Sequence, residues 1–159
     1  GDVLLGMANR TKTLAMKPFR GGTLCFLLAH VLFCAMLYAR RPFHWYDLLL
    51  PLCQLALIWY WNKCGVLRLR SMAGMAYLYS LLVSLMVVKA LQAGFFARAD
   101  KSALLPAALM AAGAVLFWVS DLILVFMYFG KIRHKRLRYW NLSTYYMGVF
   151  LLALSPAWW

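Results

Sequence analysis

Residues 103–129 read ALLPAALMAAGAVLFWVSDLILVFMYF, and the single charged side chain in this stretch is Asp121. At a rise of 1.5 Å per residue, a helix of this length crosses the ~30 Å hydrocarbon core of a bilayer. Ionisable side chains within such spans are rare and usually face a bundle interior or a water-filled cavity. The stretch therefore predicts a membrane-spanning helix, with Asp121 as a candidate functional residue.

The rest of the chain has the same character. Of its 159 residues 65% are hydrophobic and its mean hydropathy is +0.73, against ~45–50% apolar residues in ordinary soluble domains. We expect residues 1–159 to form one domain, an all-α polytopic bundle whose N-terminal helices are missing from this sequence. An apolar segment at residues 1–7 is interpreted as the end of an earlier helix. The five expected spans are Gly21–Tyr38, Trp45–Trp61, Met72–Phe96, Ala103–Phe129 and Tyr139–Trp158.

The net charge of +13 comes from basic residues between the spans. Twelve Lys and Arg residues fall in alternate loops on one side and four on the other. This bias predicts that the first side is cytoplasmic and that anionic lipids are the partners of the basic loops. A basic soluble face for nucleic acid is absent, so nucleic-acid binding is not expected. Lys89 falls near the opposite interface, where it is expected to snorkel, and Asp47 and Asp100 are expected to be solvated at loop ends.

The four cysteines show no metal-type spacing and lie mostly in apolar runs, so we expect small buried side chains rather than disulfides or metal ligands. We find no nucleophile elbow, phosphate-binding loop or zinc motif. The sequence therefore predicts no metal and no cofactor, and any chemistry would be proton transfer by carboxyl, imidazole and phenol groups.

Counting from the basic loops places polar side chains of several spans at one depth, about 12–14 Å into the membrane. Ser120 lies beside Asp121, and Gly113, two turns away, would let another helix or a ligand approach closely. We expect these polar residues to converge on one layer near the cytoplasmic side. The layer consists of Asp2, His30, Gln54, Ser80, Asp121, Tyr145 and Tyr146.

Such a layer fits more than one class of protein. Buried Asp and His residues serve proton-coupled transport as well as acid–base catalysis. A proton-coupled transporter or lipid carrier and an inactive membrane scaffold are therefore alternatives to a hydrolase. Inverted repeats or paired broken helices would favour transport, and the sequence shows neither.

Several segments resemble the YhhN-like lysoplasmalogenase family of integral membrane proteins. The resemblance covers most of the chain, and its most specific part is the string from Gly113 to Asp121, GAVLFWVSD. The other matching segments follow in the order of the family. They are Gly1-Asp2 with the leucines after it, FLLAHVLF at residues 26–33, Tyr145-Tyr146, and LLALS at residues 151–155.

The resemblance implies about eight membrane helices in the whole protein and hydrolysis of the vinyl ether bond of lysoplasmalogens, a class of lysophospholipid. It also implies that Asp2 and Asp121 are the catalytic pair. A carboxylic acid in an apolar pocket can hold a proton near neutral pH, and a second carboxylate can stabilise an oxocarbenium ion. His30, Ser120, Gln54 and the Tyr145–Tyr146 pair are expected to bind substrate or support the acids. The expected location is a bacterial inner membrane.

Overall fold

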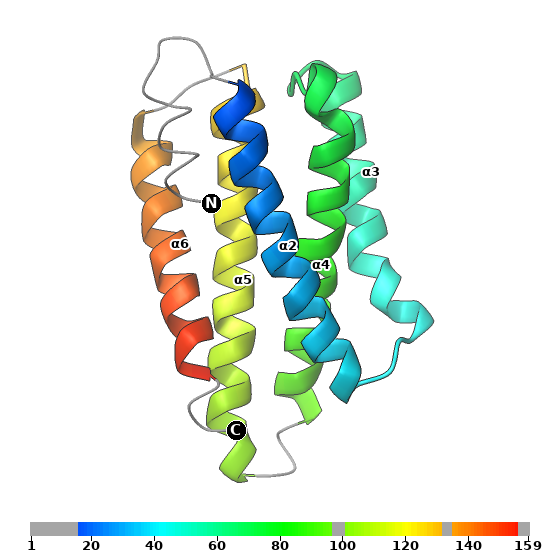
Figure 1. Cartoon of the computed structure of the whole chain (residues 1–159), viewed down its shortest axis with the longest axis vertical. Helices are drawn as coiled ribbons and strands as arrows, with labels where there is room; N and C mark the ends of the chain where they lie inside the picture. Colours follow the sequence, from blue (N-terminus) through cyan, green and yellow to red (C-terminus); the bar gives the residue numbers. More distant parts are fainter. Residues whose placement is uncertain (1–15, 97–100, 132–134, 156–159) are drawn as a thin grey trace.

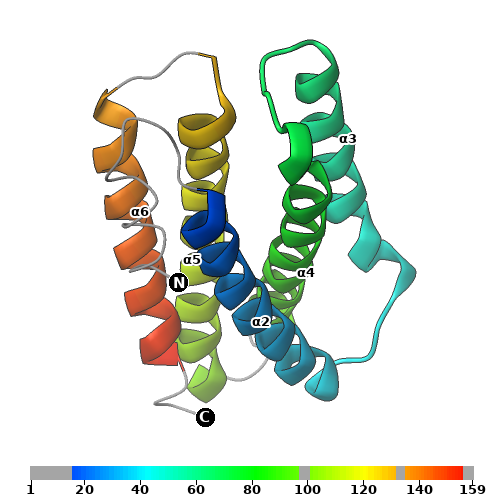
Figure 2. The same cartoon turned by 45° about the horizontal axis from the view of Figure 1, so that its top comes forward.

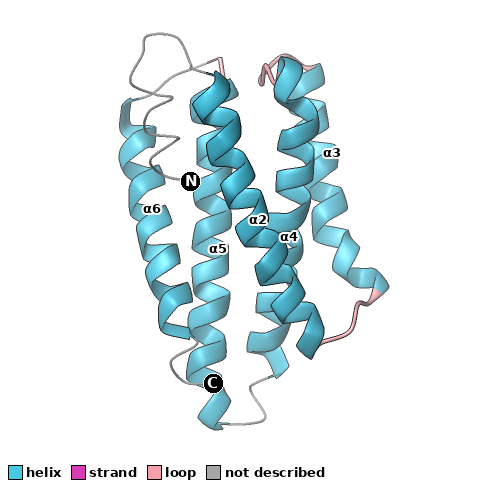
Figure 3. Cartoon of the chain, viewed as in Figure 1, coloured by secondary structure: helices cyan, strands magenta, loops and turns pink. Residues whose placement is uncertain are grey.

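A computed structural model describes residues 16–96, 101–131 and 135–155, and over these ranges the protein is a helical bundle without a sheet (Figures 1 and 3). Short 3₁₀ turns, η1 (Trp45–Leu48) and η2 (Arg70–Met72), precede two of the helices. The expected all-α fold is confirmed, whereas the apolar segment at residues 1–7 lies outside the described residues. The α-helices are α2 (Met16–Arg40), α3 (Leu49–Lys63), α4 (Ala73–Phe96), α5 (Lys101–Phe129) and α6 (Lys135–Leu154).

Three helical stretches of the described chain are long and apolar enough to cross a membrane. They are Lys17–Arg40, Arg70–Phe96 and Leu104–Phe129, with hydropathies of 2.0, 1.8 and 2.2. The helix α3 has 15 residues and reaches about 22 Å, less than the ~30 Å core. The helix α6 carries several basic residues in its first turn, which lowers its hydropathy. The protein thus has the helices of a multi-pass membrane protein. At the expected second span, α3 is shorter than these three helices, and at the expected fifth span, α6 is less apolar than they are.

The start of α2, the α3–α4 connection and the end of α5 lie at one end of the bundle. Leu67 forms an isolated antiparallel bridge with Gly130, and the Arg68 N–H donates to the Phe129 carbonyl at 2.9 Å. The Phe19 ring of α2 packs on the Phe129 ring, with centroids 5.8 Å apart. These contacts bring the expected basic side of the chain together as one surface.

Helices α5 and α6 approach each other closely at two glycines. A methyl group at Gly113 would lie 2.9 Å from the Gly148 carbonyl oxygen, and one at Gly148 would lie 2.8 Å from the Phe117 backbone nitrogen. A side chain at either position would therefore push the helices apart, which confirms the close approach expected at Gly113. On the other side of α5, α4 packs between α5 and α3, and α2 crosses α4 obliquely (Figures 1 and 2).

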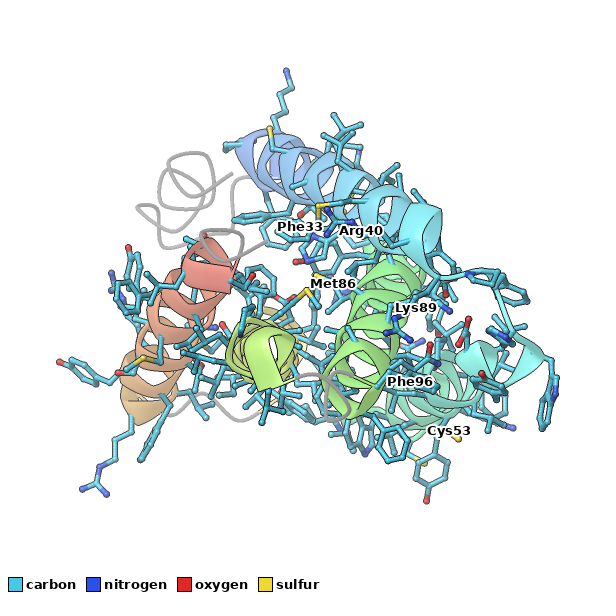
Figure 4. All side chains as sticks on the ribbon, turned by 90° about the horizontal axis from the view of Figure 1, so that it is seen from below. Phe33, Arg40, Cys53, Met86, Lys89 and Phe96 are labelled. Atoms are coloured by element: carbon cyan, nitrogen blue, oxygen red, sulfur yellow. The ribbon has the colours of Figure 1, made fainter. Side chains whose placement is uncertain are left out.

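A buried ion pair lies near the other end of α4 and corrects two sequence expectations. Lys89 and Asp47 are 1% and 0% exposed, and their charged atoms are 2.7 Å apart. The Lys89 ammonium also donates to the Pro42 carbonyl at 2.8 Å and to the Gln92 side chain at 3.2 Å. Gln92 in turn donates to the other Asp47 oxygen at 2.6 Å, and the His44 N–H donates to Asp47 at 2.9 Å. Lys89 therefore does not snorkel and Asp47 is not solvated, because each neutralises the other within the protein. Figure 4 labels Lys89 on α4.

The cysteines differ from the sequence expectation as well. Cys34 is 8% exposed and lies in the main apolar cluster, as expected. Cys25 and Cys53 are exposed on the outer faces of α2 and α3, because the apolar surroundings that the sequence indicated are those of lipid-facing positions. Cys64 is exposed at the turn that follows α3.

Candidate functional site

The Asp121 side chain accepts a hydrogen bond from another helix. The phenol of Tyr79 on α4 donates to Asp121 Oδ2 at 3.0 Å. Asp121 lies about two turns before the end of α5, or about 12 Å from the basic end of the bundle at helical rise. An acid at this depth needs such a partner, because an unpaired carboxylate in an apolar interior is costly.

His30 on α2 joins this pair through the Tyr79 ring. The two ring centroids are 5.3 Å apart in an edge contact, and His30 is 4% exposed. Its Nδ1 lies 2.7 Å from the Phe26 carbonyl oxygen, which can only accept a hydrogen bond. Nδ1 therefore carries the proton of the neutral ring, and Nε2 is left as a hydrogen-bond acceptor.

Aromatic rings form the apolar wall beside these polar groups. The Phe117 centroid lies 5.1 Å from that of His30 and 5.5 Å from that of Tyr145 on α6. Phe26 of α2 closes the set, with its centroid 6.2 Å from Tyr145. Phe117 lies one turn before Asp121 on the same face of α5, which places these rings beside the half-buried acid. We call the set His30, Tyr79, Phe117, Asp121 and Tyr145 the Asp121 cluster.

The structure thus brings together three of the expected site residues, His30, Asp121 and Tyr145. Asp2, the expected second acid, lies outside the described residues. Tyr146 follows Tyr145 on α6 but is 61% exposed, with its ring centroid 5.2 Å from that of Tyr145. It is therefore at the edge of the cluster, on the outer surface of α6.

Ser120 and Gln54 make contacts of a different kind. Ser120 is 1% exposed and points to α6, where the Asn141 amide donates to its hydroxyl at 2.9 Å and to its carbonyl at 2.8 Å. Gln54 of α3 accepts a hydrogen bond from the Trp118 indole at 2.6 Å. Ser80 is buried, and its carbonyl accepts from the Ser84 hydroxyl at 2.6 Å. Ser120 and Gln54 therefore join neighbouring helices in the structure, whereas the Ser80 hydrogen bond lies within α4. The expected role of Ser120 and Gln54 in substrate binding stays a prediction.

Tyr79 is the polar member of the cluster that the sequence did not indicate. Its neighbour Ser80 lies at the expected depth, but depth alone does not tell which face of a helix a side chain occupies. Successive residues point about 100° apart around a helix. Counting depth and face together would have selected Tyr79.

A groove elsewhere on the bundle lies between α4 and α5, towards the end that holds the ion pair. Its volume is about 810 Å³. None of its lining residues belongs to the Asp121 cluster. They are Tyr46, Leu91, Gln92, Gly94, Phe95, Phe96, Leu104, Ala108 and Ala111. Within the described part of the chain, His, Cys, Asp and Glu side chains form no group of three or more that could hold a metal ion.

The described chain has three helices that are long and apolar enough to span a membrane, and two of them are joined by the Tyr79–Asp121 hydrogen bond. These features define an integral membrane protein with polar side chains between its spans. The match to a family model is more specific. Residues 1–156 match the YhhN family, and the chain belongs to that family. Searches of curated proteins and of solved structures each found no match.

Proposed function

We propose that this protein is a membrane hydrolase that cleaves the vinyl ether bond of lysoplasmalogens, releasing a fatty aldehyde and a glycerophospho-alcohol. The observation that carries the proposal is the Asp121–Tyr79 hydrogen bond beside aromatic rings, in a member of the YhhN family, which contains lysoplasmalogenases. Vinyl ether hydrolysis needs an acid strong enough to protonate carbon yet protonated near neutral pH. An acid in an apolar pocket meets this need.

The proposed reaction begins with proton transfer from a carboxylic acid to the alkene carbon that is not bonded to oxygen. The remaining carbon–oxygen unit becomes an oxocarbenium ion. Water then adds to the carbon of that unit and gives up a proton to a base, which forms a hemiacetal. The carbon–oxygen bond to glycerol in the hemiacetal then breaks. The departing glycerol oxygen takes up a proton to become the alcohol, while the hemiacetal hydroxyl gives up its proton and becomes the carbonyl of the aldehyde. The whole reaction consumes one water, and the acid recovers its proton.

Two carboxyl groups and one imidazole suit these steps. Asp121 and Asp2 are proposed as the acid and its carboxylate partner, which stabilises the positive charge of the intermediate. His30 Nε2, as an acceptor, is suited to hold the attacking water. The wall of Phe26, Phe117 and Tyr145 would keep other water away from the reactive intermediate.

The basic end of the bundle suits the substrate headgroup. Arg68 and Arg70 are exposed in the α3–α4 connection, and Lys131 is exposed at the end of α5. A single-chain lipid could place its phosphate at this surface and its vinyl ether about 12 Å deeper, near Asp121. We propose that this side faces the cytoplasm of a bacterial inner membrane, as the charge bias predicts.

The test is aldehyde release from a lysoplasmalogen by the purified full chain in detergent. We expect release by the wild type and a loss of at least a hundred-fold in Asp121→Asn. Asp100→Asn is the matched control, because it makes the same chemical change at an acid that the sequence places in a loop, and it should retain activity. Well-folded wild type that releases no aldehyde would instead favour a transporter, a lipid carrier or an inactive scaffold.

A further inference from the structure

Tyr79 engages one of the two oxygens of Asp121. Its phenol donates to Oδ2 at 3.0 Å, and among the described residues no donor is placed on Oδ1. A proton on the acid therefore belongs on Oδ1, since Oδ2 already accepts. This leaves Oδ1 as the oxygen from which Asp121 can deliver a proton.

The position of Tyr79 is itself fixed by packing. The His30 ring contacts its ring from α2 with a 5.3 Å centroid separation and a 69° angle between the planes. α4 also packs directly against α5, the helix of Asp121. Tyr79 of α4 thus contacts α2 through its ring and α5 through its hydroxyl group. These two contacts limit the rotation of the Asp121 carboxyl group.

Hydrogen bonds to a charged acceptor are stronger than those to a neutral one. When a protonated Asp121 gives up its proton, the phenol hydrogen bond strengthens and stabilises the new carboxylate. A contact that strengthens as the reaction proceeds lowers the barrier rather than only binding the substrate. Tyr79 keeps its own proton throughout.

We propose that Asp121 is the general acid of the reaction and that Tyr79 is its positioning residue. This inference rests on the proposed function and assigns the roles of the two acids, which the sequence leaves open. Asp121 Oδ1 loses its proton to the alkene carbon, while Tyr79 holds Oδ2 and stabilises the resulting charge.

The first test is the kinetics of Tyr79→Phe, which removes the hydroxyl and keeps the ring that contacts His30. We expect kcat to fall roughly ten- to one-hundred-fold with KM changed less than about two-fold, because the lost hydrogen bond acts in the transition state. Tyr77→Phe is the matched control, since this ring is on the same helix but packs against the separate cluster around Ile58 and Leu67. A kcat for Tyr79→Phe equal to that of Tyr77→Phe would overturn the assignment.

A second test does not depend on turnover. The hydrophobic reagent dicyclohexylcarbodiimide reacts with protonated carboxyl groups, and mass spectrometry locates the labelled residue. We expect Asp121 to be labelled at pH 7 in the wild type, and roughly three- to ten-fold faster in Tyr79→Phe, because the loss of the donor favours the protonated acid and uncovers Oδ2. Labelling of Asp121 at the same rate in Tyr79→Phe and Tyr77→Phe would refute the role of Tyr79.

The two tests separate the two proposals. Absence of aldehyde release from the wild type rejects the hydrolase, whereas the labelling rates still report on the Tyr79–Asp121 contact. Protection of the buried Cys34 thiol from alkylation verifies that each variant is folded before either measurement.

Discussion

Replacing Lys89 by Met tests the buried ion pair most directly. Lys89 is 1% exposed, and its ammonium has three partners within 3.2 Å, Asp47, Pro42 and Gln92. Methionine has a similar length but no charge, so the Asp47 carboxylate would stay buried without its counter-ion. Breaking a buried pair in this way typically costs about 3–5 kcal/mol of unfolding free energy. At about 2–4 °C of Tm per kcal/mol for a chain of this size, we expect Tm to fall by about 6–20 °C.

The assay uses Cys34 as the reporter. In a background with Ala at Cys25, Cys53 and Cys64, the thiol of Cys34 stays buried until the bundle opens. A thiol-reactive fluorophore therefore reports the thermal unfolding of the detergent-solubilised protein. This background serves as the reference for every variant.

A second substitution separates the cost of the unpaired Asp47 charge from the cost of changing the Lys89 side chain itself. Adding Asp47→Asn to Lys89→Met removes the uncompensated charge. The one amide oxygen of Asn can still accept from the His44 N–H, and its NH2 group can donate to the Gln92 oxygen that Lys89 no longer occupies. We expect the double variant to recover at least half of the lost Tm, because the costs of the two substitutions are not additive. A fall of less than about 2 °C in Lys89→Met would refute the reasoning, since it is the result expected of a solvated, snorkelling lysine.

Three further predictions concern other parts of the bundle. Gly148→Leu should reduce the amount of folded protein and lower Tm by several degrees, because a Cβ at this position would lie 2.8 Å from the Phe117 backbone nitrogen; size-exclusion chromatography and the thiol assay measure this. Gln54→Leu should destabilise the bundle by about 1–3 kcal/mol, since the Trp118 indole loses its acceptor, and the thiol assay measures this; a loss of aldehyde release per folded molecule beyond the loss of stability would support the expected role of Gln54 in the site, and an unchanged Tm would contradict the contact with Trp118. Asp47 lies in η1, outside the three long spans, where burial raises its pKa but the hydrogen bonds from Lys89, His44 and Gln92 outweigh burial and hold the pKa below its ordinary value. Its contribution to stability should therefore be fully present above about pH 4 and disappear only as the pH falls through this lowered pKa. The Tm difference between wild type and Asp47→Asn should accordingly be flat from pH 5 to 8. A Tm difference that already shrinks near pH 6 would contradict the ion pair.

The sequence predicted the helices well because an apolar run long enough to cross a bilayer indicates a membrane-spanning helix. It predicted α5 to within two residues at its start, and it identified Gly113 as a point of close approach. The partner glycine, Gly148, was not identified, because nothing in the local sequence tells which helices will be neighbours. Helices α3 and α6 lie at the expected second and fifth spans, but α3 has only 15 residues and α6 begins with basic residues, so neither is among the three long apolar helices of the described residues.

The sequence predicted how deep the candidate site residues lie along their helices, but not which face of its helix each side chain occupies. Counting residues from the basic loops brought His30, Asp121 and Tyr145 to one level, and the structure joins them in one cluster. Ser120 has the right depth but the wrong face, so it binds Asn141 on α6 instead.

The ion pair was missed for a related reason. Asp47 and Lys89 belong to different helical segments, and a charge in a sequence does not reveal its partner when that partner is distant along the chain. Each residue was therefore assigned the solvent-exposed position that is usual for its type.

The ion pair also bears on how the chain enters a membrane. A lysine within α4 is expensive to release into lipid by itself, and Asp47 supplies its counter-charge from the segment that leads into α3. The two halves of the pair therefore favour insertion of α3 and α4 as one hairpin rather than in succession.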